Sequence, residues 1–356
     1  MNSPALEADM DRLRIAVVGP GLIGKKHIDL IRSRDDCVVA AIVAPDHEQN
    51  HSIVRELDVP LFFSVQAALA EANLDGVIVS SPNPFHAEQA TACILAGVPV
   101  LIEKPITDSF DSGLELVTLA ESSGAKVLVG HHRAHSPLLA AARDLISSGA
   151  LGRVVSIMGS ALFYKPAEYF AAGPWRTRKG GGPILINLIH EIGNYRSMCG
   201  EIVGVHAMTS SAARQYEVED TAAVCFSFAS GAIGTFLLSD TAASNRSWEH
   251  TSGENPVYPS YPNEECYLVS GTLGSLSVPS MRVTSYADGT PSWLKPMETR
   301  QLAVERQDPL ACQLSNFVDV IRGTAAPLVT ARDGLRNLQI VDAIQISASE
   351  RRCVAV

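Results

Sequence analysis

Short apolar runs alternate with helical patterns over the first third of the chain. The runs at 14–19, 38–43, 76–80, 98–102 and 126–129 are β-rich, and the segments at 22–33, 86–96 and 112–121 are long enough for crossover helices. Continuous apolar strands that alternate with helices are typical of a parallel sheet covered on both faces. Crossovers of this kind are right-handed in nearly all proteins. We therefore predict a doubly wound α/β domain of Rossmann type over residues 1–134.

The pattern changes after about Leu151. Strand-like segments follow one another without helices between them, at 154–162, 203–209, 221–228, 232–239 and 266–278. Ala229-Ser230-Gly231 has the composition of a hairpin turn. Helical patterns at 308–321 and 331–349 close the chain. We expect an α+β domain with a mainly antiparallel open sheet over 135–356, serving substrate binding and oligomerisation.

Two further expectations come from this half of the chain. An antiparallel sheet with helices on one face leaves the other face open, which favours a homodimer or homotetramer through that face. The segment 242–263 contains three prolines and is interpreted as a long excursion from the sheet. Its Trp248 and His250 fit either a lid or a subunit contact.

Composition and charge mainly exclude classes of protein. The 356 residues include 28 Lys+Arg against 38 Asp+Glu, a net charge of −10. The overall electrostatic field of such an acidic chain does not favour binding to nucleic acid or to an anionic membrane. No apolar stretch approaches about 18 residues, and Met1–Arg14 lacks the pattern of a secretion signal. Seven scattered cysteines without a CxxC pair favour reduced thiols in the cytoplasm.

A glycine motif directly follows the first predicted strand. Gly19, Gly21 and Gly24 fit G-x-G-x-x-G and open the first predicted helix. In this context the first glycine permits a tight turn, the second lets the backbone approach a pyrophosphate, and the third lets helix and strand pack closely. The helix N-terminus adds N–H groups and a partial positive charge. Together with Leu22 and Ile23, these residues form the predicted phosphate cradle of a dinucleotide.

The choice between NAD and NADP rests on the end of the second predicted strand. An acidic residue that binds the ribose is expected there, but the position is Ala44, and Asp46 comes two residues later. Asp46 fits a ribose ligand and a solvated turn residue equally well. Neither Arg nor Lys stands beside it to pair a 2′-phosphate, which slightly favours NAD over NADP.

Two further segments carry a family resemblance. One runs from S-S-P-N-P-F-H at 80–86 to the triplet E-K-P at 103–105, and the other from W-R at 175–176 through three glycines to His190. With the cradle, they resemble the glucose–fructose oxidoreductase / inositol dehydrogenase (Gfo/Idh/MocA) family. The resemblance implies an NAD(P)-dependent dehydrogenase or reductase that acts on a secondary alcohol or ketone of a sugar, cyclitol or related alicyclic compound. No metal is implied.

The motifs extend the predicted cofactor site beyond the cradle. Its further members are Ser81, Pro82, Asn83, His86, Glu103, Lys104, Trp175 and Arg176. Glu103 is expected to pair with or orient Lys104, and the family resemblance implies a cis Lys104–Pro105 bond. Trp175 and Arg176 fit a cap on the nicotinamide or substrate, although Trp175 also fits a cover over apolar core.

Lys104 and His190 are the catalytic candidates, and both are expected to contact substrate. Lys104 ends a strand on the carboxyl side, where doubly wound sheets bind ligands, and its ammonium can stabilise a developing alkoxide. His190 suits general acid/base work. We expect the two groups to meet beside the nicotinamide, with roles that could be exchanged.

One departure from the family pattern accompanies His190. The family commonly has aspartate four residues earlier, where this chain has Ile186 with Asn187 beside it. Either Asn187 contacts the substrate, or another group replaces the aspartate, or catalysis rests on Lys104 and His190.

The segment 130–135, G-H-H-R-A-H, ends another predicted strand. His132 and Arg133 are candidates for a substrate or nicotinamide contact, with a structural role as the alternative. The spacing could suggest a metal site, but no nearby carboxylate or cysteine completes one, so we expect none.

Two other functions remain open at this stage. Relatives of this fold resemble NAD-dependent glycosidases, and others resemble nicotinamide sensors without turnover. Loss of an acidic residue at 186 keeps the sensor possible, while Lys104 and His190 favour an enzyme.

Overall fold

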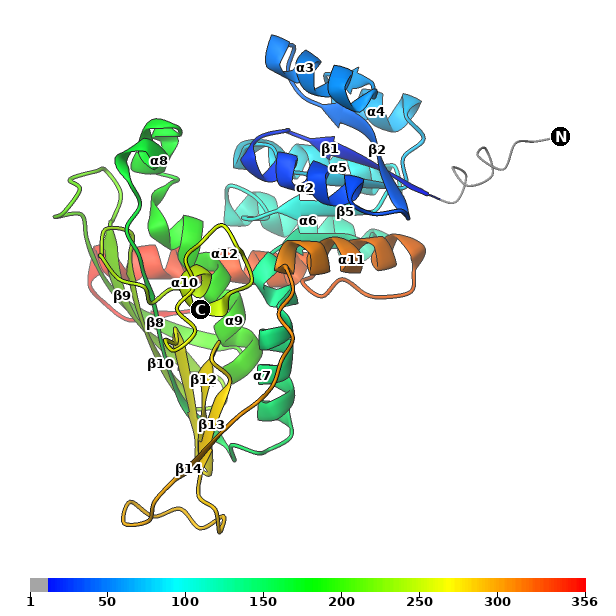
Figure 1. The fold of residues 1–356 in the computed structure, drawn as a ribbon. Coiled ribbons are helices and arrows are strands. Elements are labelled where there is room, and N and C mark those ends of the chain that lie inside the picture. The colour runs from blue at the N-terminus through cyan, green and yellow to red at the C-terminus, as the bar shows by residue number, and fades with distance from the viewer. Residues whose placement is uncertain (1–11) are drawn as a thin grey trace. The chain divides into compact units, whose positions relative to one another are not determined.

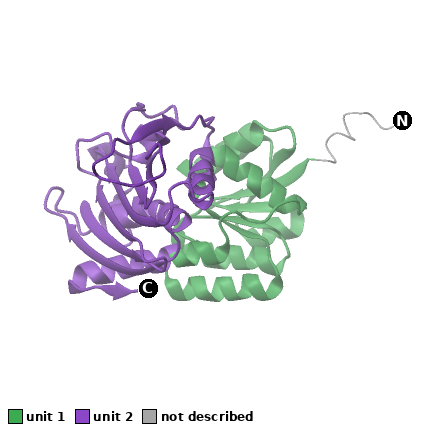
Figure 2. Ribbon diagram, turned by 90° about the horizontal axis from the view of Figure 1, so that it is seen from below, with its two compact units in different colours: residues 1–132, 310–336 green, residues 133–309, 337–356 purple. Residues whose placement is uncertain are grey.

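The computed structural model describes residues 12–356 (Figure 1). Residues 1–11, which include most of the segment considered as a signal sequence, lie outside the described part. The chain divides into two compact units, coloured separately in Figure 2. Unit 1 runs to His132 and also includes Leu310–Arg336, and unit 2 comprises Arg133–Pro309 and Asn337–Val356. The return of 310–336 to unit 1 differs from the predicted division, which placed everything after 134 in the second domain.

Unit 1 is built on a six-stranded, all-parallel sheet in the order β3-β2-β1-β4-β5-β6. The strands are β1 (Leu13–Val18), β2 (Cys37–Val43), β3 (Leu61–Phe62), β4 (Gly76–Val79), β5 (Val100–Glu103) and β6 (Val127–Gly130). The helices are α2 (Leu22–Arg32), α3 (Glu48–Leu57), α4 (Val65–Glu71), α5 (His86–Leu95), α6 (Phe110–Ser123) and α11 (Pro309–Arg322). The order reverses between β1 and β4, which is where ligands bind in such sheets. The predicted Rossmann-type fold is confirmed.

The core of unit 1 explains why α11 belongs to it. Ile78 and Leu101 are fully buried in the central strands, and they share a cluster with Leu314, Phe317 and Val318 of α11. Parallel strands need cover on both faces, and α11 supplies part of that cover. A sequence pattern shows that 308–321 is an apolar helix, but not which sheet it covers.

Unit 2 contains a nine-stranded sheet in the order β14-β13-β12-β11-β7-β10-β9-β8-β15. The strands are β7 (Val154–Leu162), β8 (Ile202–Ser210), β9 (Thr221–Phe228), β10 (Ile233–Ser239), β11 (Tyr267–Gly271), β12 (Gly274–Val278), β13 (Arg282–Ser285), β14 (Glu298–Gln301) and β15 (Val354–Ala355). The pairing is antiparallel except between β7 and β10. The predicted strand at 266–278 is in fact the hairpin β11–β12, because the chain turns at Thr272 and Leu273.

The helices of unit 2 are α7 (Pro137–Ser147), α8 (Ala167–Ala171), α9 (Ile189–Cys199), α10 (Trp248–Ser252) and the second half of α12 (Ala331–Glu350). Tyr195 of α9 is 1% exposed and meets Phe226, Phe236 and Tyr267 edge to face. The inward face of the sheet is therefore aromatic. No helix in the described part of the chain is long and apolar enough to cross a membrane.

Candidate active site

The glycine motif forms a turn that only glycine fits at two of its positions. Gly19 has φ +80°, and a Cβ there would lie 2.7 Å from the Ser81 Cα at the end of β4. A Cβ on Gly24 would collide with the Gly19 carbonyl oxygen and lie 2.8 Å from Ser80 Oγ. The first turn of α2 is therefore pressed against the ends of β1 and β4.

Gly21, the middle glycine of the motif, has free space beside it, whereas Gly19 and Gly24 are enclosed. A Cβ on Gly21 would meet nothing within 4 Å, and Gly21 is the N-cap of α2 without a side-chain hydrogen bond to the first turn. Leu22 beside it is 79% exposed, and Ile23 is half-buried. The N–H groups of this helix end are thus left for a ligand, as a pyrophosphate requires. The turn fits a dinucleotide.

A side chain at position 21 should hinder cofactor binding without destabilising the fold. We expect Gly21→Val to weaken NADH binding about 10- to 150-fold, the cost of one lost hydrogen bond to a charged group, because its side chain enters the space above the helix end. The melting temperature should change little, since φ −74° suits any residue. Gly24→Ala is the matched control and should lower the melting temperature instead. Equal NADH dissociation constants for Gly21→Val and wild type would contradict this assignment.

His86 connects two loops at the carboxyl edge of the sheet. Its Nδ1 lies 2.9 Å from the Pro105 carbonyl oxygen, and its Nε2 lies 2.8 Å from the Ser81 carbonyl oxygen. The ring is 1% exposed. His86, predicted as a cofactor ligand, is thus occupied in holding the segment after β4 to the segment after β5. Pro82 is exposed and Asn83 half-buried in the short 3-10 helix Asn83–Phe85 between them.

Glu103 is also used within the protein. Its Oε1 lies 2.8 Å from His27 Nε2, and its Oε2 accepts the backbone N–H of Lys104 at 3.3 Å. A Cβ on Gly130 would lie 2.9 Å from this carboxyl group, so glycine at the end of β6 provides its space. Glu103 contacts Lys104 through the backbone N–H and is 6% exposed, and a cofactor contact from it stays a prediction. Its partner His27 lies 76 residues away and has no local sign in the sequence.

Lys104 follows β5 directly, and the Lys104–Pro105 bond is cis, as the family resemblance implied. Lys104 is half-buried. Because β5 is separated from β1 only by β4, Lys104 lies at the same carboxyl edge as the phosphate cradle.

Asp46 lies after β2, beyond the buried Ala44. Its side chain is 74% exposed, and its Oδ1 is 2.7 Å from His51 Nε2. A ribose contact from Asp46 stays a prediction.

His190 lies on α9, directly after a π-helix at Ile184–Leu188. The sequence predicted a helical segment here but not the wider turn. His190 is 4% exposed, while Ile186 and Asn187 are half-buried. A single π-helical turn is common at functional sites because it shifts the side chains that follow it.

A lysine that the sequence analysis missed reaches this turn. Lys165, after β7, donates from Nζ to Asn187 Oδ1 at 2.7 Å and lies 3.8 Å from Asp240 Oδ2. In the sequence, Lys165 is only a lysine that follows the end of a predicted strand. Lysines in that position are too common to identify a functional residue.

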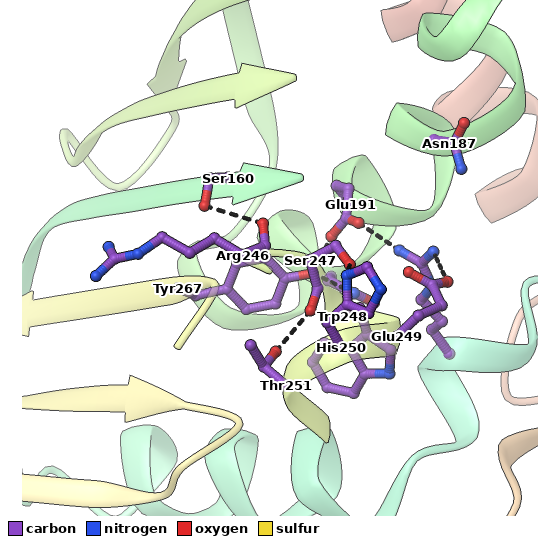
Figure 3. A network of polar contacts seen from close by, with 12 residues as sticks. Ser160, Asn187, Glu191, Arg246, Ser247, Trp248, Glu249, His250, Thr251 and Tyr267 are labelled. Carbon is purple, nitrogen blue, oxygen red and sulfur yellow. Dashed lines mark hydrogen bonds and ion pairs between the residues drawn. The ribbon is translucent and has the colours of Figure 1, made fainter. Parts of the chain in front are cut away.

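Arg133 lies within a buried network of unit 2, and Figure 3 shows its partners Glu191 and Glu249. Its guanidinium donates to both Glu191 and Glu249, and Glu191 also accepts from the Tyr267 hydroxyl. Arg133 is 3% and Glu191 1% exposed. Of the two roles left open for Arg133, these contacts favour the structural one, in which two carboxylates surround a single cation.

The excursion after β10 joins this network through α10. Trp248 is 3% exposed and donates from Nε1 to Glu254 Oε2 at 3.0 Å, and Ser136 Oγ donates to Glu254 Oε1 at 2.5 Å. Trp248 is thus a core residue and not an exposed lid side chain. Burial raises the pKa of Glu254 to about 7 and also raises the pKa of Glu191.

The raised pKa of Glu254 predicts how stability depends on pH. Unfolded Glu254 titrates near 4.5, so between pH 4.5 and 7 the folded chain holds a proton that the unfolded chain releases. This contribution to stability is complete below pH 4.5 and is lost as pH rises through 7. Glutamine has no such proton to lose. The melting temperature of Glu254→Gln, measured relative to that of wild type, should therefore rise as the pH is raised from 5 to 8. If the difference in melting temperature between Glu254→Gln and wild type stays constant from pH 5 to pH 8, Glu254 is not the group responsible.

The remaining candidates are placed as follows. Trp175 is 51% exposed in the 3-10 helix Pro174–Thr177, and the Arg176 guanidinium lies 4.1 Å from the centre of the Tyr169 ring. His132 begins the 3-10 helix His132–His135, and burial lowers the pKa of His135 to about 4. Among residues 12–356 no three His, Cys, Asp or Glu side chains are grouped to hold a metal ion.

Two family models match most of this chain. Residues 13–131 match the model of an oxidoreductase family with an NAD-binding Rossmann fold, and residues 139–277 match a GFO/IDH/MocA C-terminal domain. The chain belongs to the Gfo/Idh/MocA oxidoreductases. Unit 1 is thus an NAD-binding Rossmann domain, and the protein is an oxidoreductase. The predicted family and enzyme class are confirmed.

Similar proteins agree with this placement in the Gfo/Idh/MocA family. An inositol 2-dehydrogenase from Rhodococcus erythropolis is 32% identical over 154 residues, which are 41% of this chain and 43% of that enzyme. A 1,5-anhydro-D-fructose reductase from Ensifer adhaerens is 27% identical over 77% of this chain and 78% of its own. The WlbA dehydrogenase from Bordetella pertussis, solved with NADH and UDP-GlcNAcA, has a TM-score of 0.78 at 23% identity, over 97% of this chain and 99% of its own.

Proposed function

We propose that this oxidoreductase transfers hydride between nicotinamide and a secondary alcohol or ketone of a sugar, cyclitol or related ring. The observation that supports it most is the position of Lys104. It lies at the same carboxyl edge of the sheet as the open helix end at Gly21, where a bound dinucleotide and a reacting alcohol would be handled together. The related inositol 2-dehydrogenase and anhydrofructose reductase support the substrate class.

Two side chains would carry the proposed chemistry, Lys104 and His190. The turn at Gly19, Gly21 and Gly24 would hold NAD, which would supply a hydride acceptor for the alcohol carbon. The Lys104 ammonium stabilises the negative charge that develops on the alcohol oxygen, and the His190 imidazole takes its proton. Glu103 and His86 hold the Lys104 segment through its backbone N–H and the Pro105 carbonyl. In the reductive direction the same groups return the proton.

The test is a substrate panel of polyols, aldoses, cyclitols and their ketones, followed at the nicotinamide absorbance with NAD and NADP in parallel. We expect turnover with at least one ring alcohol and a preference for NAD, because Asp46 is the nearest charged side chain after β2 and would repel a 2′-phosphate. NADH binding without turnover across the whole panel would instead favour a nicotinamide sensor.

We also propose that two copies pair through the open face of the unit 2 sheet. Outward positions of β7, β8 and β10 are apolar: Met158 is 57%, Met208 72% and Ile233 62% exposed. A patch of this kind on a protein surface marks an interaction site, and a two-fold pairing lets the same apolar face cover itself.

Solution mass and thiol access test the pairing. Light scattering should give a multiple of the 38.0 kDa chain mass, and Leu237→Asp in the centre of the face should reduce it to one chain. Leu328→Asp, at an exposed apolar position of unit 1, should not. Cys225 on β9 and Cys353 are both exposed in the single chain. In wild type, pairing should make Cys225 react with a thiol reagent more slowly than Cys353. In Leu237→Asp this difference in rate should disappear. A monomeric wild type would overturn the proposal.

A further inference from the structure

Helix α2, whose first turn forms the cradle, also places a histidine in the core of unit 1. His27 is 0% exposed and follows Gly24 by three residues, on the side of the helix that packs against the ends of β1 and β4. Its neighbours Ile28 and Ile31 belong to the apolar core. A buried imidazole costs desolvation unless it forms hydrogen bonds, so His27 needs a polar partner at this position.

The partner is Glu103, at the end of β5 and separated from β1 by β4 in the sheet. His27 Nε2 lies 2.8 Å from Glu103 Oε1, and the Glu103 side chain is 7% exposed. The carboxyl group lies over Gly130 at the end of β6, where a Cβ would come within 2.9 Å of it. The histidine of α2 and the glycine of β6 therefore confine Glu103 from two sides.

The second ring nitrogen of His27 indicates which form of the imidazole is present. Nδ1 is buried and has no hydrogen-bond partner among residues 12–356. A charged imidazolium would leave an N–H unsatisfied there, at a higher cost than the bare nitrogen of the neutral ring. The neutral ring with its proton on Nε2 therefore fits, and it donates to Glu103. A neutral donor orients the carboxylate without cancelling its charge.

The other oxygen of this carboxylate contacts the candidate lysine. Glu103 Oε2 accepts the Lys104 backbone N–H at 3.3 Å, and an uncancelled charge makes that hydrogen bond charge-assisted. On the other side of Lys104, the Pro105 carbonyl oxygen lies 2.9 Å from His86 Nδ1. The backbone of Lys104 is thus held before its Cα by Glu103 and after it through Pro105. Loss of His27 would loosen the first of these supports.

We propose that His27 is a positioning residue, which acts through Glu103 to hold Lys104 in its reactive place. The inference rests on the proposed function, because it takes Lys104 as the group that stabilises the oxyanion. A misplacement of about 1 Å in a reacting group can cost about 100-fold in rate, even when the altered residue is far from the chemistry. A support works when its own side chain is locked by packing, as that of His27 is on α2.

Steady-state kinetics measure the effect on the reaction. His27→Leu should lower kcat about 10- to 100-fold and leave KM and the NADH dissociation constant nearly unchanged. His27→Gln should retain more activity than His27→Leu, because its amide can still donate to Glu103. Ile31→Ala is the matched control: it opens a cavity under the same helix, and should lower the melting temperature without lowering kcat.

A double variant separates positioning from stability. His27→Leu removes a donor from a buried carboxylate and should lower the melting temperature. Adding Glu103→Met replaces both polar partners with apolar groups, so the melting temperature should recover. The value of kcat should stay low, because Lys104 still lacks its support. If kcat recovers together with the melting temperature, the pair is merely structural and the proposal is overturned.

A measurement without substrate keeps this inference apart from the proposed function. The full-length chain is treated with acetic anhydride, and the rate at Lys104 is compared with that at exposed Lys26 of the same unit by peptide mass spectrometry. His27→Leu should raise the relative rate at Lys104 severalfold, and Ile31→Ala should not. An unchanged rate in His27→Leu overturns the proposal. Full activity of Lys104→Met would count against the proposed function, whereas a raised rate at Lys104 would still support its positioning by His27.

Discussion

Lys104→Met should lower kcat/KM about 100- to 1000-fold, the usual cost of removing one group that stabilises a developing oxyanion. Methionine has nearly the same length and keeps the half-buried stem in place, but it supplies neither charge nor proton. Because the cradle lies in the β1–α2 turn and not at Lys104, the NADH dissociation constant should stay within a few-fold of wild type. Steady-state kinetics and NADH fluorescence titration measure the two quantities separately.

Lys26→Met is the matched control for this result. Lys26 is an exposed residue of α2 in the same unit, so its loss should leave kcat/KM nearly unchanged. Full activity of Lys104→Met would remove the lysine from the chemistry. A large rise in the NADH dissociation constant would instead mean that Lys104 serves cofactor binding.

Arg133→Met should destabilise unit 2 by about 3–5 kcal/mol, the range for breaking a buried ion pair by removing one partner. Arg133 is 3% exposed and is the cation between Glu191 and Glu249. Without it, two carboxylates stay close together, with Glu191 fully out of water. Urea unfolding followed by circular dichroism gives the free energy of unfolding directly.

Two companion variants show whether the loss comes from uncompensated charge. Adding Glu191→Gln to Arg133→Met should recover part of the stability, because the double variant buries one charge fewer. Arg332→Met breaks the pair with Glu121, whose side chains are 63% and 50% exposed, and should cost much less stability than Arg133→Met because water screens an exposed pair. Equal losses for Arg133→Met and Arg332→Met would contradict the buried-charge explanation.

The parts of this molecule that could be predicted from sequence are those set by local pattern. The strand at Val154–Leu162 and the helix from Leu22 are visible because period and glycine placement are local properties. The glycine turn after β1 is visible for the same reason. Lys104 and His190 stay predictions, chosen through motifs whose order is fixed along the chain.

What could not be predicted depends on partners far apart in sequence. Glu103 meets His27 across 76 residues, and Arg133 meets Glu249 across 116. A buried ion pair has no local signature, so the sequence left Arg133 open between a ligand contact and a structural role. Trp248 was open between a lid and an interface for the same reason. The π-helix before His190 differs from an α-helix by one residue per turn, which the apolar pattern does not resolve.

The assignment of Leu310–Arg336 to unit 1 bears on how this protein is made. A ribosome releases the six parallel strands long before α11, whose Phe317 and Val318 complete their core. The nascent Rossmann domain therefore has an unsealed apolar side while all of unit 2 up to Pro309 is being synthesised. Its closing helix follows residues 133–309 in the chain, so the nucleotide-binding unit can mature only after most of unit 2 has been made.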